Sequence, residues 1–265
     1  MSAQLENLVQ AVLNSAKYRS VAPDLIARIG ERELAKGRKF KEAVKATKNK
    51  LHQVGAAYHT EPPRYNEWLT TLELAKESLP ELKLACKAVM GAHASTRERL
   101  PILEQFYTTI FAQLPEINSV LDVACGLNPL AIPWMPLQPG TRYFACDIYA
   151  DMIAFVQSFT EMLPVQGIAS ICDLSAAPPS QPVDLALALK AVPCLEQIDK
   201  QAGERLLDGL QAKYLLVSFP AKSLGGRNKG MLDNYEARFN QLTEGRGWQI
   251  QKFTFETELA FLVQT

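Results

Sequence analysis

Apolar residues in the first half of the chain recur at the spacing of amphipathic helices. One run is Leu5, Leu8, Val9, Val12 and Leu13, and a second is Leu25, Ile26, Ile29 and Leu34. Spacings of three and four place such side chains on one face of a helix. Prolines at positions 23, 62 and 63 mark a helix start and a break. We therefore predict a domain of several short helices over residues 1–105.

The pattern changes after residue 114, where short apolar runs alternate with helical segments. The runs are residues 119–124, 142–146, 167–172, 183–189 and 213–219, with helical segments at 152–162 and 201–210. This alternation is typical of βαβ units and a parallel sheet. Two closing runs, 248–253 and 258–263, are close enough to pair as an antiparallel hairpin at the sheet edge. Residues 106–265 are thus expected to form an α/β domain with a seven-stranded, mostly parallel sheet.

Charge is unevenly distributed along a chain that has 28 basic and 28 acidic residues. Between residues 17 and 50, eleven basic residues stand against four acidic ones. Such an excess indicates a local phosphate-binding face, although a solvated helix face has the same composition. The RNA-binding candidates are Arg32, Arg38, Lys39, Lys41, Lys45 and Lys48.

Composition also indicates the cellular compartment and whether the chain has disulfides or a metal site. No apolar stretch approaches the roughly 20 residues that span a bilayer, and the first ten residues do not resemble a signal peptide. We expect a cytoplasmic protein without a membrane segment. The five cysteines are far apart and form no CxxC pair, so we interpret them as buried thiols and expect neither disulfides nor a metal site.

Small or acidic residues follow three consecutive predicted strands. The first strand leads into a turn in which Ala124 and Gly126 let a ligand approach the backbone. Asp147 ends the second strand, where a carboxylate can accept both hydroxyls of a ribose. Asp173 and Leu174 end the third strand, where they can flank an adenine. One such Asp is often only a helix N-cap, but acids at successive strand ends favour an adenosine-containing cofactor.

A nicotinamide dinucleotide is the main rival for this site. The turn lacks the G-x-G-x-x-G spacing that brings a pyrophosphate to a helix N-terminus. Prolines at 129, 133, 136 and 139 would also interrupt a long helix after the turn. The turn therefore suits a cofactor without phosphates.

Four blocks of the sequence are distinctive. Three of them carry most of the signal: HASTRERL at 93–100, LDVACGLNPL at 121–130, and SFP, SLGGR and KGM within 218–231. The fourth, LKAVPCLEQ at 189–197, is weaker. These blocks resemble the aminoglycoside-resistance 16S ribosomal RNA methyltransferases, which methylate N7 of a guanine in the decoding site. The resemblance covers nearly the whole chain, and the predicted strand layout is similar to that of class I, Rossmann-like methyltransferases.

The resemblance implies that S-adenosylmethionine is the cofactor and S-adenosylhomocysteine the product. It assigns Arg99 to the methionine carboxylate, which a planar guanidinium can bind through two hydrogen bonds, with Arg97 as the competing candidate. It also places His93 in the cofactor site. We expect Asp147→Ala and Arg99→Ala each to weaken cofactor binding while leaving the fold intact.

The resemblance further places Lys190 and Arg227 beside the target nucleotide, with Gly225 and Gly226 in a loop over the substrate. Guanine N7 carries a free lone pair, so methyl transfer needs orientation but no general base. A guanine inside folded RNA must be flipped out, and Phe219 is our candidate for stacking on it. The alternatives are Tyr235 and Phe239, although aromatics at such positions more often belong to the core.

The expected partner is 16S rRNA within the assembled small ribosomal subunit, bound by a monomer through its basic helical domain. Two alternatives remain open from the sequence. One is a methyltransferase of another rRNA position, such as N1 of an adenine. The other is a non-catalytic RNA-binding assembly factor that retains the cofactor fold.

Overall fold

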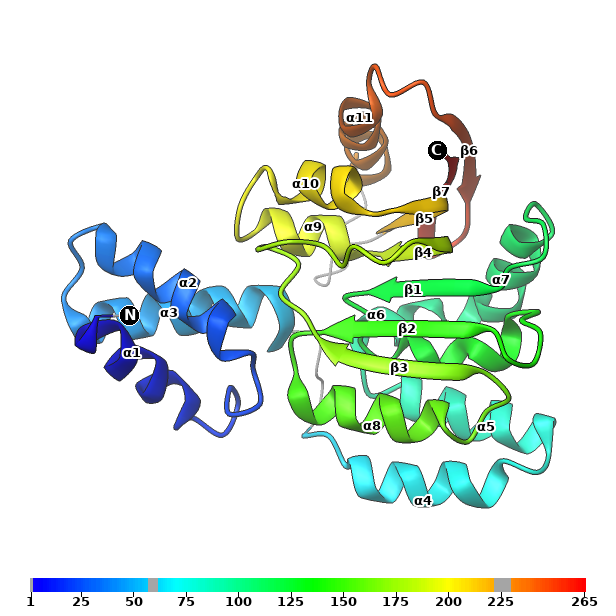
Figure 1. Ribbon diagram of the computed structural model, residues 1–265, viewed down its shortest axis with the longest axis horizontal. Coiled ribbons are helices and arrows are strands. Elements are labelled where there is room, and N and C mark those ends of the chain that lie inside the picture. The colour runs from blue at the N-terminus through cyan, green and yellow to red at the C-terminus, as the bar shows by residue number, and fades with distance from the viewer. Residues whose placement is uncertain (1, 57–61, 222–229) are drawn as a thin grey trace.

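A seven-stranded sheet forms the centre of the molecule in a computed structural model that describes residues 2–56, 62–221 and 230–265 (Figure 1). The strands are β1 (Ser119–Val123), β2 (Arg142–Asp147), β3 (Gln166–Ile171), β4 (Val183–Leu189), β5 (Ala212–Pro220), β6 (Gln249–Thr254) and β7 (Glu258–Gln264). Their order is β3-β2-β1-β4-β5-β7-β6, and the first five are parallel. The predicted seven-stranded, mostly parallel sheet is confirmed.

The terminal hairpin forms as predicted, with one strand inside the sheet. β7 pairs antiparallel with both β5 and β6, so β6 is the edge strand. The burial pattern agrees, because six of the seven β7 residues are buried while β6 is mostly exposed. An antiparallel strand begins at the edge where its parallel neighbours end. Glu258, the first residue of β7, is consequently registered opposite Pro220, the last residue of β5.

Helices cover both faces of the sheet (Figure 1). One side carries α4 (Tyr65–Ala75), α5 (Leu79–Met90), α7 (Leu103–Phe111), α8 (Ala150–Thr160) and the short η3 (Asn128–Trp134). The other side carries α9 (Ala191–Glu196), α10 (Ala202–Gly209) and α11 (Met231–Thr243). The two layers match two separate clusters of buried apolar residues. This three-layer arrangement hides both faces of the central strands β1 and β4 from water, whereas the edge strand β3 keeps one face exposed.

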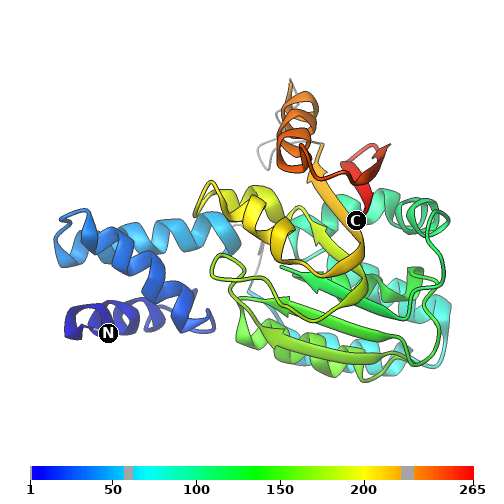
Figure 2. The same ribbon diagram turned by 45° about the horizontal axis from the view of Figure 1, so that its top comes forward.

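The first three helices form a separate lobe that stands beyond the carboxyl ends of β1, β2 and β3 (Figures 1 and 2). They are α1 (Ala3–Leu13), α2 (Pro23–Ala35) and α3 (Phe40–Leu51), followed by η1 (His52–Ala56). Pro23 opens α2, as predicted. In contrast, α4 packs on α8, where Tyr65 stacks on Phe155 with ring centroids 5.2 Å apart. We propose a domain boundary between η1 and α4 instead of at residue 105.

Candidate active site

A pocket lies at the carboxyl edge of the sheet, where the turn after β1 brings its backbone to the surface of the cavity. Ala124 and Gly126 adopt left-handed φ angles of 49° and 52°. A Cβ at Gly126 would lie 2.9 Å from the imidazole Cε1 of His93, so only glycine fits there. Ala124, Gly126 and His93 all line the pocket. The turn continues into η3, a short 3-10 helix that contains Pro133.

Asp147 anchors this turn from the end of β2. Its Oδ2 accepts a hydrogen bond from the Gly126 backbone N–H at 2.9 Å, and its Oδ1 accepts one from the Ile148 N–H at 2.6 Å. Burial raises the pKa of Asp147, while the backbone donors act in the opposite direction. The carboxylate lines the pocket, so the predicted ribose acid and the glycine turn are one preorganised unit.

Asp173 lies beyond β3 and has partners from two parts of the chain. Its Oδ1 accepts hydrogen bonds from the N–H and hydroxyl of Ser175 at 2.9 and 2.8 Å, and its Oδ2 pairs with Arg28 of α2. Asp173 and the buried Leu174 both line the pocket. Arg28 was not among the sequence candidates, because nothing local in α2 indicates that it faces a strand end.

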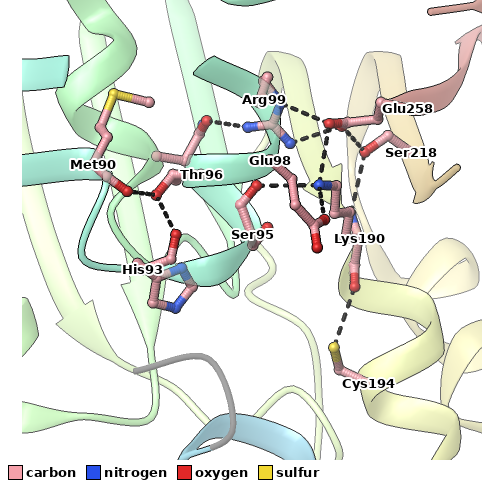
Figure 3. A network of polar contacts seen from close by, with 11 residues as sticks. Met90, His93, Ser95, Thr96, Glu98, Arg99, Lys190, Cys194, Ser218 and Glu258 are labelled. Atoms are coloured by element: carbon pink, nitrogen blue, oxygen red, sulfur yellow. Dashed lines mark hydrogen bonds and ion pairs between the residues drawn. The ribbon is translucent and has the colours of Figure 1, made fainter. Parts of the chain in front are cut away.

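Arg99 is fully buried at the end of α6 (Ala94–Arg99) and is held by a second buried ion (Figure 3). Its Nε and Nη2 donate to the two carboxylate oxygens of Glu258 at 2.9 and 2.7 Å, and its Nη1 donates to Asn128 Oδ1 at 2.7 Å. Burial opposes the charge of Glu258, but Arg99 and Lys190 hold its pKa below the usual value. Three of the five guanidinium N–H groups are therefore used inside the protein.

Lys190 joins the same network from the end of β4 (Figure 3). Its ammonium donates to Glu98 Oε2 at 2.8 Å and to the Ser95 carbonyl at 3.1 Å, and it lies 3.5 Å from Glu258 Oε2. Its backbone has a left-handed φ of 59°, an uncommon conformation for a residue with a Cβ. Lys190 lines the pocket with only 5% of its surface exposed. The site thus places two cations beside two carboxylates.

Asp122 also lines the pocket and, unlike Asp147 and Asp173, it is buried; the sequence reasoning did not identify it. Its Oδ2 accepts from Asn128 Nδ2 at 2.9 Å and from the Tyr143 hydroxyl at 2.8 Å, whereas its Oδ1 has no hydrogen-bond partner among the described residues. Burial raises the pKa of Asp122 to about 7, against the opposing effect of these two donors. A carboxylate in this state is poised to change protonation near neutral pH.

Asp122→Asn is expected to remove a pH-dependent loss of stability. Between about pH 4 and pH 7 the folded state holds a proton that the unfolded chain has released, so Asp122 lowers stability as pH rises through this window. The cost is at most about 1.4 kcal/mol for each pH unit. Denaturant unfolding at about pH 5 and about pH 8 should show a smaller stability difference for the variant than for the wild type. Equal differences would contradict this assignment.

Phe219 requires a correction. It is 1% exposed, and its ring stacks on Tyr235 and meets Phe239 and Phe261 edge-on. The predicted stacking of Phe219 on a flipped base is wrong for this structure, because apolar packing on the α11 side leaves no exposed ring face. Phe239 is likewise fully buried, whereas Tyr235 is half-buried. Arg227, Gly225 and Gly226 lie outside the described residues.

The basic candidates fall into two groups. Lys39, Lys41 and Lys45 are exposed on α3 or at its start. The other three make contacts within the protein: Arg32 with Asp199, Arg38 with Glu33, and Lys48 with the Ser15 hydroxyl. Arg32 and Arg38 remain 44% exposed, so these contacts leave their charge accessible.

The cysteine prediction holds in part. Cys86, Cys125 and Cys146 are buried and free, but Cys172 and Cys194, which line the pocket, are only partly buried. Within the described ranges, no cluster of three or more potential metal ligands occurs. In the same parts of the chain, no helix is long and apolar enough to cross a membrane.

Comparison with known proteins identifies the family. The family described as "Ribosomal RNA methyltransferase (FmrO)" matches residues 14–262. A 16S rRNA (guanine(1405)-N(7))-methyltransferase of Micromonospora echinospora is 38% identical over 265 residues, covering 98% of this chain and 97% of the relative. An enzyme of the same name from Serratia marcescens is 33% identical over 262 residues, covering 98% of each.

A solved structure supports the same relationship. The 16S rRNA methyltransferase RmtF, determined in complex with S-adenosyl-L-homocysteine, superposes with a TM-score of 0.81 at 30% identity, covering 100% of this chain and 99% of that one. The likeness includes the helical lobe as well as the sheet, since it spans the full length. Sequence, fold and pocket agree, and the chain belongs to the FmrO family of ribosomal RNA methyltransferases.

Proposed function

We propose that this protein transfers a methyl group from S-adenosylmethionine to N7 of the 16S rRNA guanine that its relatives are named for, guanine 1405. The observation that carries the proposal is the pocket itself. Glycine, acidic and basic residues from four strand ends and from α6 meet there in a chain related over its full length to enzymes of that name. The chemistry of these residues matches the two ends of such a cofactor.

The lining residues fit an adenosine joined to a methionine. Asp147 would accept the ribose hydroxyls, while Asp173 and Leu174 would flank the adenine. Because Gly126 has no side chain, a space remains between its backbone and the imidazole of His93, and a larger side chain would fill it. Arg99 has N–H groups that donate to neither Glu258 nor Asn128, and these would donate to the methionine carboxylate. When bound, S-adenosylmethionine supplies an electrophilic methyl on a sulfonium, and S-adenosylhomocysteine is the product.

The residues on the base side have an orienting role. Guanine N7 has an in-plane lone pair and needs no proton removed, so the site requires alignment of the acceptor and no general base. Lys190 is buried, and its backbone is held by Ser218, which gives its ammonium a fixed place beside the pocket. We assign Lys190 to the target nucleotide side, and Arg227 to the same side on the basis of sequence alone.

The helical lobe would bind the RNA. The lobe lies next to the carboxyl edge of the sheet (Figure 2). Its exposed basic residues include Lys39, Lys41 and Lys45. Paired RNA hides its base edges, so recognition relies on shape and phosphates. We propose that a monomer acts in the cytoplasm on the assembled small subunit, where the folded decoding site presents its phosphates. Methylation there adds a positive charge that would repel polycationic aminoglycosides.

The direct test is methylation of purified small subunits by the protein and labelled S-adenosylmethionine, followed by mass mapping of 16S rRNA. We expect one methyl on the guanine at N7, loss of transfer with Asp147→Ala, and aminoglycoside resistance of a susceptible bacterium that expresses the protein. Asp151→Ala is the matched control, because Asp151 lies on α8 outside the pocket lining. A methyl on an adenine, or none despite intact fold, would contradict the proposal.

A further inference from the structure

The helical lobe contacts the loop that carries the ribose acid. Ala22 N–H donates to the Ile148 carbonyl at 2.8 Å, and Ala150 N–H donates to the Ser20 carbonyl at 2.7 Å. Val21 and Tyr149 form an antiparallel bridge between these hydrogen bonds. The chain that enters α2 is therefore bonded through its backbone to the residues immediately after Asp147.

A second set of contacts reaches the loops after β3 and α9. Arg28 pairs with Asp173, and Arg32, one helical turn further along α2, lies 3.4 Å from Asp199 Oδ2. Lys50 of α3 donates to the Gln197 carbonyl at 3.0 Å. Three loops at the carboxyl edge of the sheet are thus each held by a residue of the lobe.

The lobe also forms part of the pocket wall. Leu25 of α2 is buried and lines the cavity, as does Gly55 of η1. A Cβ at Gly55 would lie 2.7 Å from the Tyr149 hydroxyl oxygen, so η1 packs closely against the loop after Asp147. The proposed adenosine end of the cofactor therefore faces the catalytic sheet on one side and the helical lobe on the other.

We propose that Arg28 is a positioning residue for Asp173, and that it couples cofactor binding to docking of the helical lobe on the ribosomal subunit. The inference rests on the proposed function. Asp173 has 9% of its side chain exposed, so without Arg28 its carboxylate would lose its charged partner in a nearly buried place. The lobe contacts the cofactor pocket and would also bind RNA, so it can couple the binding of the cofactor to the binding of the RNA. Such coupling is reciprocal, because each ligand changes the affinity for the other by the same factor.

The first experiment measures S-adenosylhomocysteine affinity by calorimetry. We expect Arg28→Ala to weaken binding about fivefold or more, the lower end of ordinary coupling between sites, and Arg28→Lys to recover part of the loss. Lys36→Ala is the matched control, because Lys36 is the C-cap residue of the same helix and pairs with Glu33, away from the pocket. Its affinity should equal that of the wild type. Thermal unfolding of each variant identifies any loss of folded protein, and Arg28→Lys replaces Arg28→Ala if the latter does not fold.

The second experiment measures binding to purified small subunits with and without saturating S-adenosylhomocysteine. In the wild type we expect the product to tighten subunit binding about fivefold, and in the Arg28 variant we expect this ratio to approach one. Equal S-adenosylhomocysteine affinity in Arg28→Ala and the wild type would overturn the positioning role, and an unchanged ratio would overturn the coupling. A wild-type protein that binds no S-adenosylhomocysteine would instead contradict the proposed function.

Discussion

Replacing Arg99 with alanine is expected to lower the free energy of unfolding by about 3–5 kcal/mol. The substitution leaves the Glu258 carboxylate, which is 0% exposed, without its bidentate partner, and the ammonium of Lys190 lies 3.5 Å away. The sequence-based expectation that Arg99→Ala leaves the fold intact is therefore revised, because the structure places this arginine in a fully buried ion pair. Denaturant unfolding followed by circular dichroism measures the change.

Two variants make this result specific. Arg97 lies on the same helix as Arg99 but is exposed. The free energy of unfolding of the Arg97→Ala variant should therefore stay within about 0.5 kcal/mol of the wild-type value. Adding Glu258→Gln to Arg99→Ala removes the stranded charge and should recover part of the lost stability. If Arg99→Ala unfolds at the same denaturant concentration as Arg97→Ala, the buried pair does not stabilise the fold. Cofactor affinity of Arg99 variants is meaningful only where most of the protein is folded.

Replacing Arg38, Lys39, Lys41 and Lys45 together with glutamine is expected to weaken small-subunit binding strongly and to flatten its dependence on salt. Each phosphate neutralised by a basic residue releases counterions and contributes about 0.9 to the logarithmic salt slope of duplex DNA. Four lost contacts would reduce the slope by roughly 3 to 4. Affinity for S-adenosylhomocysteine should remain near the wild-type value, because none of the four residues lines the pocket.

A matched loss of four charges provides the control. Lys76, Arg142, Lys213 and Lys252 are basic residues outside the helical lobe, and glutamine at these positions changes the net charge by the same amount. We expect this control to retain most of the salt dependence. Subunit binding measured by filter retention across a salt series separates the two outcomes. If both quadruple variants bind equally at every salt concentration, the basic segment is only a solvated helix face.

Much of the architecture was predictable because it depends on local patterns. Apolar spacing predicted the five parallel strands to within a few residues, and the alternation with helices predicted their parallel pairing. The same logic located Gly126, Asp147 and Asp173, since parallel strands end at one edge of a sheet and their final residues must meet there. These positions follow from chain order alone, so no knowledge of packing was needed.

Tertiary structure decided which side chains meet across long separations in the sequence. Glu258 reaches Arg99, 159 positions away, only because β7 runs antiparallel and starts where β5 ends. Phe219 has the sequence context of a site residue, but the apolar surface of α11 covers it, and only packing determines that. Arg28 looks like one more basic residue of a helical lobe until the lobe docks against the end of β3. Local sequence patterns determine the helices and strands and which of their faces are apolar. Burial and strand register determine which charged side chains pair with one another.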